Sequence, residues 1–133
     1  MKKLADAGYK PSLPLGLDFE DNPAYNQEWG SNKTNNDLWI NTFISELKKV
    51  GYDAFLYGGS VIRERTSGNF SVPLWYSRYL SNPEISKPTT PIKGWKDWTV
   101  WQFSAGGRFN GNTSNFDLNA MKKNFFDSHP LIT

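Results

Sequence analysis

Residues 13–20 constrain the fold of this chain more than any other segment. Their side chains are apolar almost without a break up to Leu17, and the run then continues as Asp18-Phe19-Glu20. A strand that is apolar on both faces is typical of a parallel sheet that is covered on both sides. The segment therefore predicts a buried strand of an α/β fold, with Pro14 near its beginning.

The order of the remaining segments favours the same fold class. Short apolar runs predict further strands at residues 54–57, 72–76 and 98–103, and helical patterns predict helices at 37–50, 60–65 and 118–126, with a loop at 105–115. Strands that alternate with helices over short connections indicate a right-handed parallel arrangement. A length of 133 residues fits one domain, so we expect a single domain over residues 1–133.

Two carboxylates share one face of the first predicted strand. Residues i and i+2 of a strand point the same way, so the Cβ atoms of Asp18 and Glu20 lie about 6.6 Å apart, two rises of about 3.3 Å each. Repulsion between such groups raises one pKa, which leaves a protonated acid beside a carboxylate, as glycosidic cleavage requires. Salt bridges, capping of backbone groups or a bound metal ion are the alternative explanations. Asp21 is expected to point away and to cap the following loop.

Aromatic and polar side chains lie where the other predicted strands end or soon after: Tyr57, Trp75, Tyr76, Trp101, Gln102 and Asp117. The carboxyl ends of parallel strands meet at one edge, where α/β folds hold their sites. Aromatic rings can stack on sugars, so Tyr57, Trp75 and Tyr76 together predict a cleft lined with aromatic faces and hydroxyl groups. Core packing is the alternative for each ring, and only one of Trp101 and Gln102 can face the site. For Asp117 the alternative is an N-cap of the last helix.

Composition excludes several other kinds of site. The net charge is +2, which argues against a dedicated nucleic-acid or anionic-lipid surface. The chain has no cysteine, which excludes a thiolate centre. Its one histidine, His129, lies in the tail, where we expect an exposed residue, and no other histidine exists to build a triad or a histidine-rich metal site. No phosphate-binding or dinucleotide-binding glycine motif is present. No membrane-spanning run and no signal peptide are visible.

Five segments together resemble the glycoside hydrolase family 25 lysozymes, the muramidases common among phage endolysins and bacterial autolysins. They are residues 15–22, 55–57, 73–79, 98–104 and 117–119, and they follow the family's order over nearly the whole chain. The resemblance implies an irregular β/α (TIM-like) barrel. It also implies an enzyme that cleaves the β-1,4 bond between N-acetylmuramic acid and N-acetylglucosamine in bacterial peptidoglycan, without a cofactor.

The resemblance also implies a role for each candidate residue. Glu20 matches the general acid, and Asp18 matches the partner that orients the 2-acetamido group of the substrate as an internal nucleophile. Asp117 matches a further acid of the family's site. The sugar groove would be lined by Tyr57, Trp75, Tyr76 and Trp101.

The position of Asp18 departs from the family pattern, because the family has further strands before this one and only 17 residues precede Asp18 here. We therefore expect an incomplete barrel that covers the C-terminal part of the fold, with residues 1–8 ending a helix. Open strand edges could make the chain self-associate. The alternative function is a catalytically inactive fragment that binds cell-wall glycan or self-associates.

Overall fold

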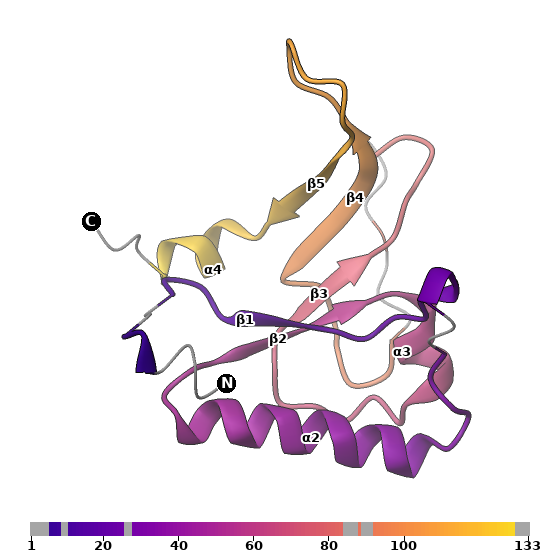
Figure 1. Cartoon of the computed structure of the whole chain (residues 1–133), viewed down its shortest axis with the longest axis vertical. Helices are drawn as coiled ribbons and strands as arrows, with labels where there is room; N and C mark the ends of the chain where they lie inside the picture. Colours follow the sequence, from indigo (N-terminus) through magenta and orange to yellow (C-terminus); the bar gives the residue numbers. More distant parts are fainter. Residues whose placement is uncertain (1–5, 9–10, 26–27, 84–87, 89–91, 130–133) are drawn as a thin grey trace.

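The computed structural model describes residues 6–8, 11–25, 28–83, 88 and 92–129. Its centre is one curled sheet with the strand order β1-β2-β3-β4-β5, formed by β1 (Leu15–Asp18), β2 (Ala54–Gly58), β3 (Leu74–Ser77), β4 (Val100–Gly107) and β5 (Phe116–Met121) (Figure 1). The first four strands are parallel, and β5 runs antiparallel to β4. The predicted α/β class is confirmed, in the form of a mixed sheet that does not close on itself within the described residues.

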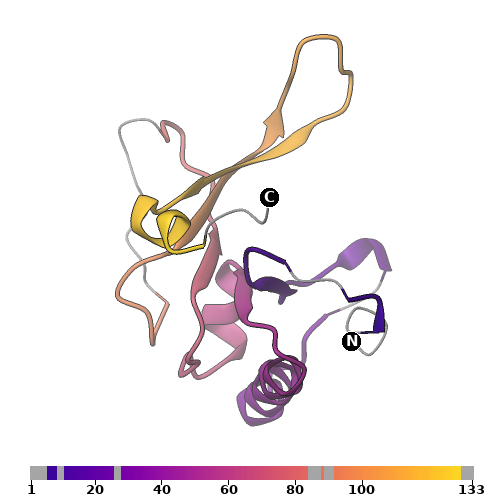
Figure 2. The same ribbon diagram turned by 90° about the vertical axis from the view of Figure 1, so that its left-hand side faces the viewer.

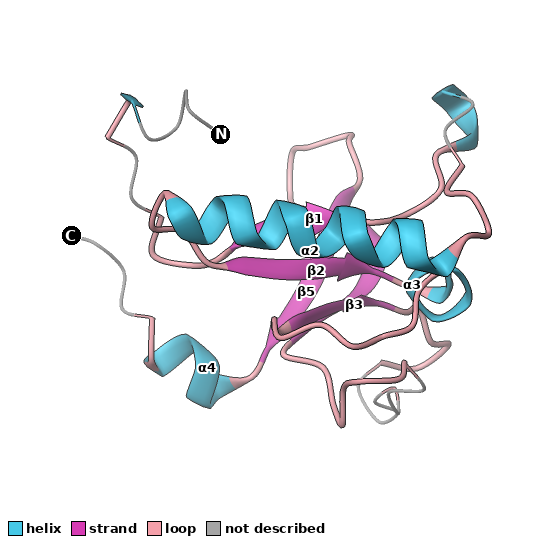
Figure 3. Ribbon diagram, turned by 90° about the horizontal axis from the view of Figure 1, so that it is seen from below, coloured by secondary structure: helices cyan, strands magenta, loops and turns pink. Residues whose placement is uncertain are grey.

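Helices α2 (Lys33–Lys49) and α3 (Ser60–Arg65) connect successive parallel strands. The short helix η1 (Pro23–Tyr25) follows β1, and α4 (Lys123–Asp127) follows β5, where its Phe125 ring packs against the Phe55 ring of β2. Helix α2 lies across β1 and β2 (Figure 3). It begins earlier than predicted, because Asn32 caps it by accepting a hydrogen bond from the Asn35 backbone N–H. Asn36 is buried inside the first turn and donates to the carbonyl oxygens of Gly30 and Arg65.

The main core lies between the sheet and its helices. Leu17, Leu56 and Leu74 are neighbours in register on β1, β2 and β3, and all are buried. Ile40 and Leu47 of α2 belong to the same core. Burial of such side chains stabilises the fold by about 1.5–3 kcal/mol each, so this face fixes the register of the three strands.

The opposite face of the sheet carries the alternate residues of the same strands. Tyr57 pairs with Trp75, Trp75 pairs with Val100, and Ser77 pairs with Gln102. Because side chains in register point to the same side, these residues share one face, turned away from α2. This face carries the candidate site.

The C-terminal part differs from the prediction. Residues 116–121, predicted as the beginning of a helix, form β5, and α4 begins only at Lys123. Strand β4 continues to Gly107, so the predicted loop is also shorter, and the β4–β5 hairpin projects beyond the other strands (Figures 1 and 2). Asp117 is therefore a strand residue and does not cap a helix.

Two further observations concern residues outside the sheet. The predicted helix end at residues 1–8 falls mostly outside the described residues. Gly8, which is described, has a positive φ of 67°. In the part of the chain that the structure describes, no helix combines the length and the apolar character needed to cross a bilayer.

Candidate active site

A hollow of about 280 Å³ opens on the face of the sheet turned away from α2. The residues that line it come from β1, β2, β3, β4 and β5 and from the segment after β1: Gly16, Asp18, Glu20, Tyr57, Trp75, Gln102 and Asp117. Its volume is near the lower end of the range for ligand pockets, about 300–1,000 Å³. The structure thus brings together all three predicted acids and two of the four predicted aromatic residues.

Strand β1 places the two neighbouring acids by alternation. Phe19, between them, is fully buried in the core, and its backbone N–H donates to the Tyr57 carbonyl oxygen at 2.9 Å. Asp18 and Glu20 consequently point to the opposite side, where both are exposed and both line the hollow. The arrangement inferred from the spacing of the two acids is therefore present in the structure.

The loop that follows the acids is anchored on the helices. Asp21 accepts a hydrogen bond from the Trp29 backbone N–H at 2.8 Å, and Arg65 donates to the Trp29 carbonyl oxygen at 2.5 Å. The Trp29 ring lies between the rings of Phe19 and Trp39, with centroid distances of 4.2 and 4.7 Å. Asp21 points into the loop, as predicted, and does not line the hollow.

The two acids have unusual proton affinities. Burial raises the pKa of Asp18 above its ordinary value. Burial also raises the pKa of Glu20, and the negative charges of Asp18 and Asp117 raise it further. No basic side chain in the described ranges forms an ion pair with any of the three acids. Glu20 therefore keeps its proton to a higher pH than an ordinary glutamate, which suits a proton donor.

The three acids are not arranged as metal ligands. Among the described residues, no group of three or more His, Cys, Asp or Glu side chains is placed to hold a metal ion. The charges of Asp18 and Asp117 thus act on Glu20 across the hollow. The arrangement offers proton transfer and charge stabilisation by carboxyl groups.

An aromatic wall stands beside the acids. The Trp75 ring packs over β1, where a Cβ atom added to Gly16 would lie 3.4 Å from the ring. Trp75 Nε1 donates to Asn119 Oδ1 at 2.8 Å, and the Tyr57 ring meets the Trp75 ring edge-on at a centroid distance of 5.2 Å. These contacts hold the indole in one orientation, so it can serve as a platform for a sugar ring.

Tyr76 and Trp101 lie elsewhere. Their exposed fractions are 5% and 2%, and both belong to the core between the sheet and its helices. Trp101 Nε1 donates to the Arg78 carbonyl oxygen at 2.6 Å. Each follows or precedes a residue that lines the hollow, so alternation turns it to the other face. The structure therefore gives these two predicted groove residues a packing role.

Gln102 is the main residue that the sequence left unassigned. It is 3% exposed, lines the hollow, and its Oε1 atom accepts three hydrogen bonds. The donors are the hydroxyl groups of Tyr57 at 3.1 Å, Ser77 at 3.1 Å and Tyr79 at 2.7 Å. Alternation with Trp101 was the available signal for Gln102. The sequence did not single out Gly16, because its place under the Trp75 ring follows from the register of the strands.

Burial raises the pKa of the Tyr57 hydroxyl, and the nearby charges of Glu20 and Asp18 also raise it, although a hydrogen bond with Ser77 acts in the other direction. The hydroxyl therefore stays protonated and remains a hydrogen-bond donor at neutral pH. Its proton is directed to Gln102, so Tyr57 contributes its ring to the wall of the hollow.

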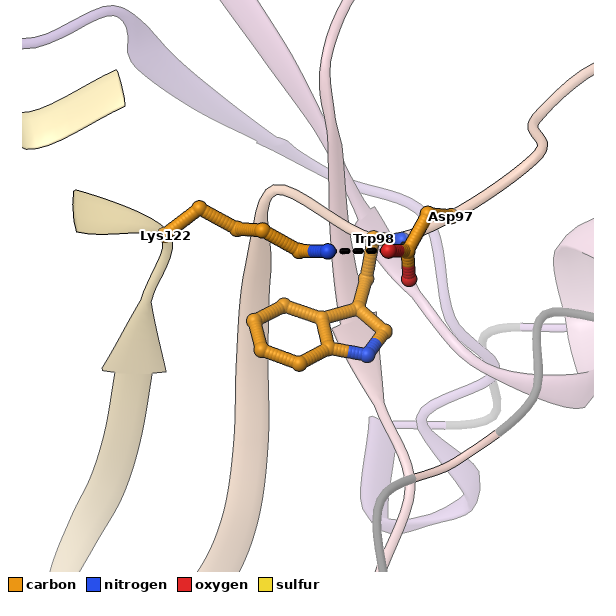
Figure 4. A network of polar contacts seen from close by, with 3 residues as sticks. All are labelled: Asp97, Trp98 and Lys122. Atoms are coloured by element: carbon orange, nitrogen blue, oxygen red, sulfur yellow. Dashed lines mark hydrogen bonds and ion pairs between the residues drawn. The ribbon is translucent and has the colours of Figure 1, made fainter. Parts of the chain in front are cut away.

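A second, larger hollow of about 700 Å³ has a different character. It lies beside Trp98, Trp101 and Phe103, and its acid, Asp97, forms an ion pair with Lys122. The Lys122 ammonium group also lies over the Trp98 ring, 4.7 Å from its centroid (Figure 4). Among the described residues that line this hollow, Asp97 is the one acid, and it is paired. The smaller hollow is therefore the candidate active site.

Two neighbouring acids with raised pKa values, placed beside aromatic rings at the end of a parallel strand, are typical of glycoside hydrolase sites. Comparison with known families agrees with this class. The model of the family "Glycosyl hydrolases family 25" matches residues 2–112, and the chain belongs to this family.

Relatives of known name support the assignment. The chain is 31% identical over 114 residues to Lysozyme M1 of Streptomyces globisporus, covering 81% of this chain and 37% of that protein. The crystal structure of the bacterial lysozyme from Streptomyces coelicolor has a TM-score of 0.68 at 31% identity and is matched over 82% of this chain and 51% of that one. The spore cortex lytic enzyme SleM of Clostridium perfringens has a TM-score of 0.65 at 29% identity, with coverages of 93% and 41%. The chain therefore spans about half or less of the length of these relatives.

Proposed function

We propose that this chain is the C-terminal part of a peptidoglycan hydrolase that cleaves the β-1,4 bond between N-acetylmuramic acid and N-acetylglucosamine. One observation carries the proposal: Asp18 and Glu20 line one hollow from the same face of β1, and the pKa of Glu20 is raised. Membership of family 25 and similarity to two proteins named as lysozymes support the substrate class.

The proposal includes the architecture. Residues 1–133 form one domain that corresponds to the C-terminal portion of an irregular β/α barrel of lysozyme type. The parallel strands β1 to β4, their open curl and the matched share of the related structures support this interpretation. Bacterial peptidoglycan is the proposed partner.

Glu20 is the proposed general acid. It donates its proton to the glycosidic oxygen while the bond from that oxygen to the sugar C1 breaks, so the leaving sugar departs as a neutral alcohol. A carboxyl group with a raised pKa is suited to this step because a larger fraction of it is protonated near neutral pH. Water later attacks C1 and returns a proton to the Glu20 carboxylate.

Asp18 is the proposed partner in substrate-assisted catalysis. Its carboxylate accepts a hydrogen bond from the N–H of the substrate's 2-acetamido group, which directs the carbonyl oxygen of that group toward C1. This oxygen then forms the new bond to C1, and Asp18 stabilises the positive charge of the resulting oxazolinium ring. Asp117 adds negative charge on the far side of the hollow, and Tyr57 and Trp75 hold the sugar rings.

The experiment compares the 133-residue chain with its Glu20→Gln variant on a peptidoglycan suspension. We expect the variant to clear the suspension at least about 100-fold more slowly, since general acid catalysis contributes roughly 10²–10⁴-fold. Binding to insoluble cell wall should be kept, because the amide preserves the shape of the side chain. Glu46→Gln is the matched control: Glu46 is an exposed residue of α2 that pairs with Lys49, and its removal should not change the rate.

Equal clearing by the wild-type chain and the Glu20→Gln variant would defeat the assignment of the general acid. Binding to cell wall without any cleavage by the wild-type chain would instead favour the inactive glycan-binding fragment. Absence of both binding and cleavage would overturn the proposed function as a whole.

A further inference from the structure

The side-chain amide nitrogen of Gln102 lacks a described hydrogen-bond acceptor. Gln102 is 3% exposed, and its Oε1 atom accepts three hydrogen bonds, yet no described residue accepts one from Nε2. Leaving a buried amide donor without a partner destabilises the protein. Since Gln102 lines the hollow, an acceptor on a bound molecule can supply the missing partner.

The oxygen of this amide faces three hydroxyl groups. The hydroxyl groups of Tyr57, Ser77 and Tyr79 come from β2, from β3 and from the residues after β3, and all three point at Oε1. With the oxygen held by three donors, the nitrogen is left to face away from them. The amide is thus set in place before a ligand arrives, which reduces the entropy lost on binding.

The other groups of the hollow make this donor distinctive. Asp18, Glu20 and Asp117 offer acceptors when ionised, and the two aromatic side chains that could donate are already engaged. Tyr57 donates its hydroxyl proton to Gln102, and Trp75 donates its indole N–H to Asn119. An amide is also uncharged, so it can bind an oxygen atom without lowering the pKa of the neighbouring Glu20 as a lysine or arginine would.

We propose that Gln102 is a substrate-binding residue whose Nε2 atom donates a hydrogen bond to an uncharged oxygen of the saccharide beside Glu20. The inference rests on the proposed function and adds to it the side-chain amide that binds this oxygen. Tyr57, Ser77 and Tyr79 act through Gln102 as positioning residues, because they hold the amide with its nitrogen toward the hollow.

Two variants at position 102 separate this role from a purely structural one. Gln102→Glu keeps an oxygen that can accept the three hydroxyl hydrogen bonds and removes the donor. Gln102→Met keeps the approximate length and removes both donor and acceptor. The variants are made in the Glu20→Gln background and titrated with the neutral N-acetylglucosamine tetramer by calorimetry. Neither ligand nor residue 20 then carries a charge. The titrations are made at high pH, so that the new carboxyl group near Asp18 and Asp117 is ionised and cannot donate.

We expect both variants to bind the tetramer about tenfold more weakly, the effect of one lost hydrogen bond. Thermal unfolding should show both variants to be less stable than the parent, because Gln102→Glu buries a charge near Asp18 and Asp117 and Gln102→Met leaves three hydroxyl groups without their acceptor. Binding is therefore compared at a temperature at which both variants are folded. If Gln102→Glu binds as tightly as the parent while Gln102→Met does not, Gln102 is a structural acceptor only and the proposal is wrong.

Tyr79→Phe provides a test that does not depend on the folding of these variants. The Tyr79 side chain is 52% exposed and donates the shortest of the three hydrogen bonds, at 2.7 Å. Its loss should loosen the amide and weaken tetramer binding by about two- to fivefold, less than the loss of the donor itself, and thermal unfolding checks that Tyr79→Phe remains folded. Unchanged binding would contradict the positioning role.

Two outcomes separate this inference from the proposed function. If the Glu20→Gln parent does not bind the tetramer and the wild-type chain does not clear peptidoglycan, the proposed function is overturned. If the wild-type chain is active and Gln102→Glu binds the tetramer as tightly as its parent, this inference alone is overturned.

Discussion

Burial raises the pKa of Glu20, and the negative charges of its neighbours in the hollow raise it further. Substitution of a neighbour can separate these two causes. Asp18 and Asp117 both contribute negative charge, and neither has an ion-pair partner among the described basic residues. A general acid works in its protonated form, so activity decreases as the pH rises through the pKa of Glu20. The position of that decrease therefore reports the charges around Glu20.

Replacing Asp117 by Asn should move this decrease to lower pH. The substitution removes one charge that raises the pKa of Glu20, so Glu20 loses its proton earlier as the pH increases. The measurement is kcat/KM for peptidoglycan cleavage across the pH range, with the position of the alkaline limb read independently of the maximum rate. Asp127→Asn on α4, where Asp127 pairs with Lys123, is the control and should leave the limb in place. A limb that stays or moves upward in Asp117→Asn would contradict the electrostatic account.

Single residues also show how far the sequence could predict the site. The i, i+2 spacing of Asp18 and Glu20 was sufficient to place both on one face, because Phe19 between them is strongly apolar. Trp75 and Tyr76 also alternate, so they face opposite sides of β3. Because both are aromatic, the sequence does not indicate which of the two faces the hollow. The register of β3 with its neighbours settles this, and it depends on the whole sheet.

At the scale of elements, the parallel strands were predictable and β5 was not. Strands β1 to β3 are short apolar runs with turn residues at their ends, and this pattern is local. Residues 116–121 include Leu, Ala and Met, which are good helix formers, yet Phe116, Leu118 and Ala120 alternate with more exposed residues. Pairing with β4 decides between the two, and that pairing is a tertiary interaction.

The end of β2 makes a close contact that a substitution should break. Gly58 has a φ of 154°, and a Cβ atom at this position would lie 2.5 Å from the Phe19 carbonyl oxygen. We expect Gly58→Ala to lower the free energy of unfolding by about 1–3 kcal/mol, because backbone must move apart where β1 and β2 meet.

Urea denaturation of Gly58→Ala and of a matched Gly30→Ala control tests this expectation. A Cβ atom at Gly30 would have no heavy atom within 4 Å, so the control should stay within about 0.5 kcal/mol of wild type. Equal stability of the two variants would show that the approach of β2 to β1 is not constrained in solution.

At the scale of the whole molecule, the sheet has two unpaired edges among its described strands. Strand β1 pairs only with β2, and β5 pairs only with β4. Helix α2 also exposes 66% of Leu38 and 43% of Trp39. Exposed edges and apolar surface favour association with other chains.

We therefore predict that the 133-residue chain self-associates. Size-exclusion chromatography with light scattering should give a mass above 15.2 kDa that increases with protein concentration, because association through an edge follows mass action. A constant mass of 15.2 kDa over the whole concentration range would show that the edges are protected. The sequence predicted open edges from the position of Asp18, but it could not say which strands would form them.

Phe19 links the chemistry to the core, since the most deeply buried side chain of this segment separates two acids on the outside. Inserting or deleting one residue here would turn Phe19 toward water and an acid toward the leucines of the core. Evolution can therefore exchange residues in this segment far more readily than it can change the segment's length. Among homologues, gaps in an alignment should be rare between positions 17 and 20, even where the individual amino acids differ.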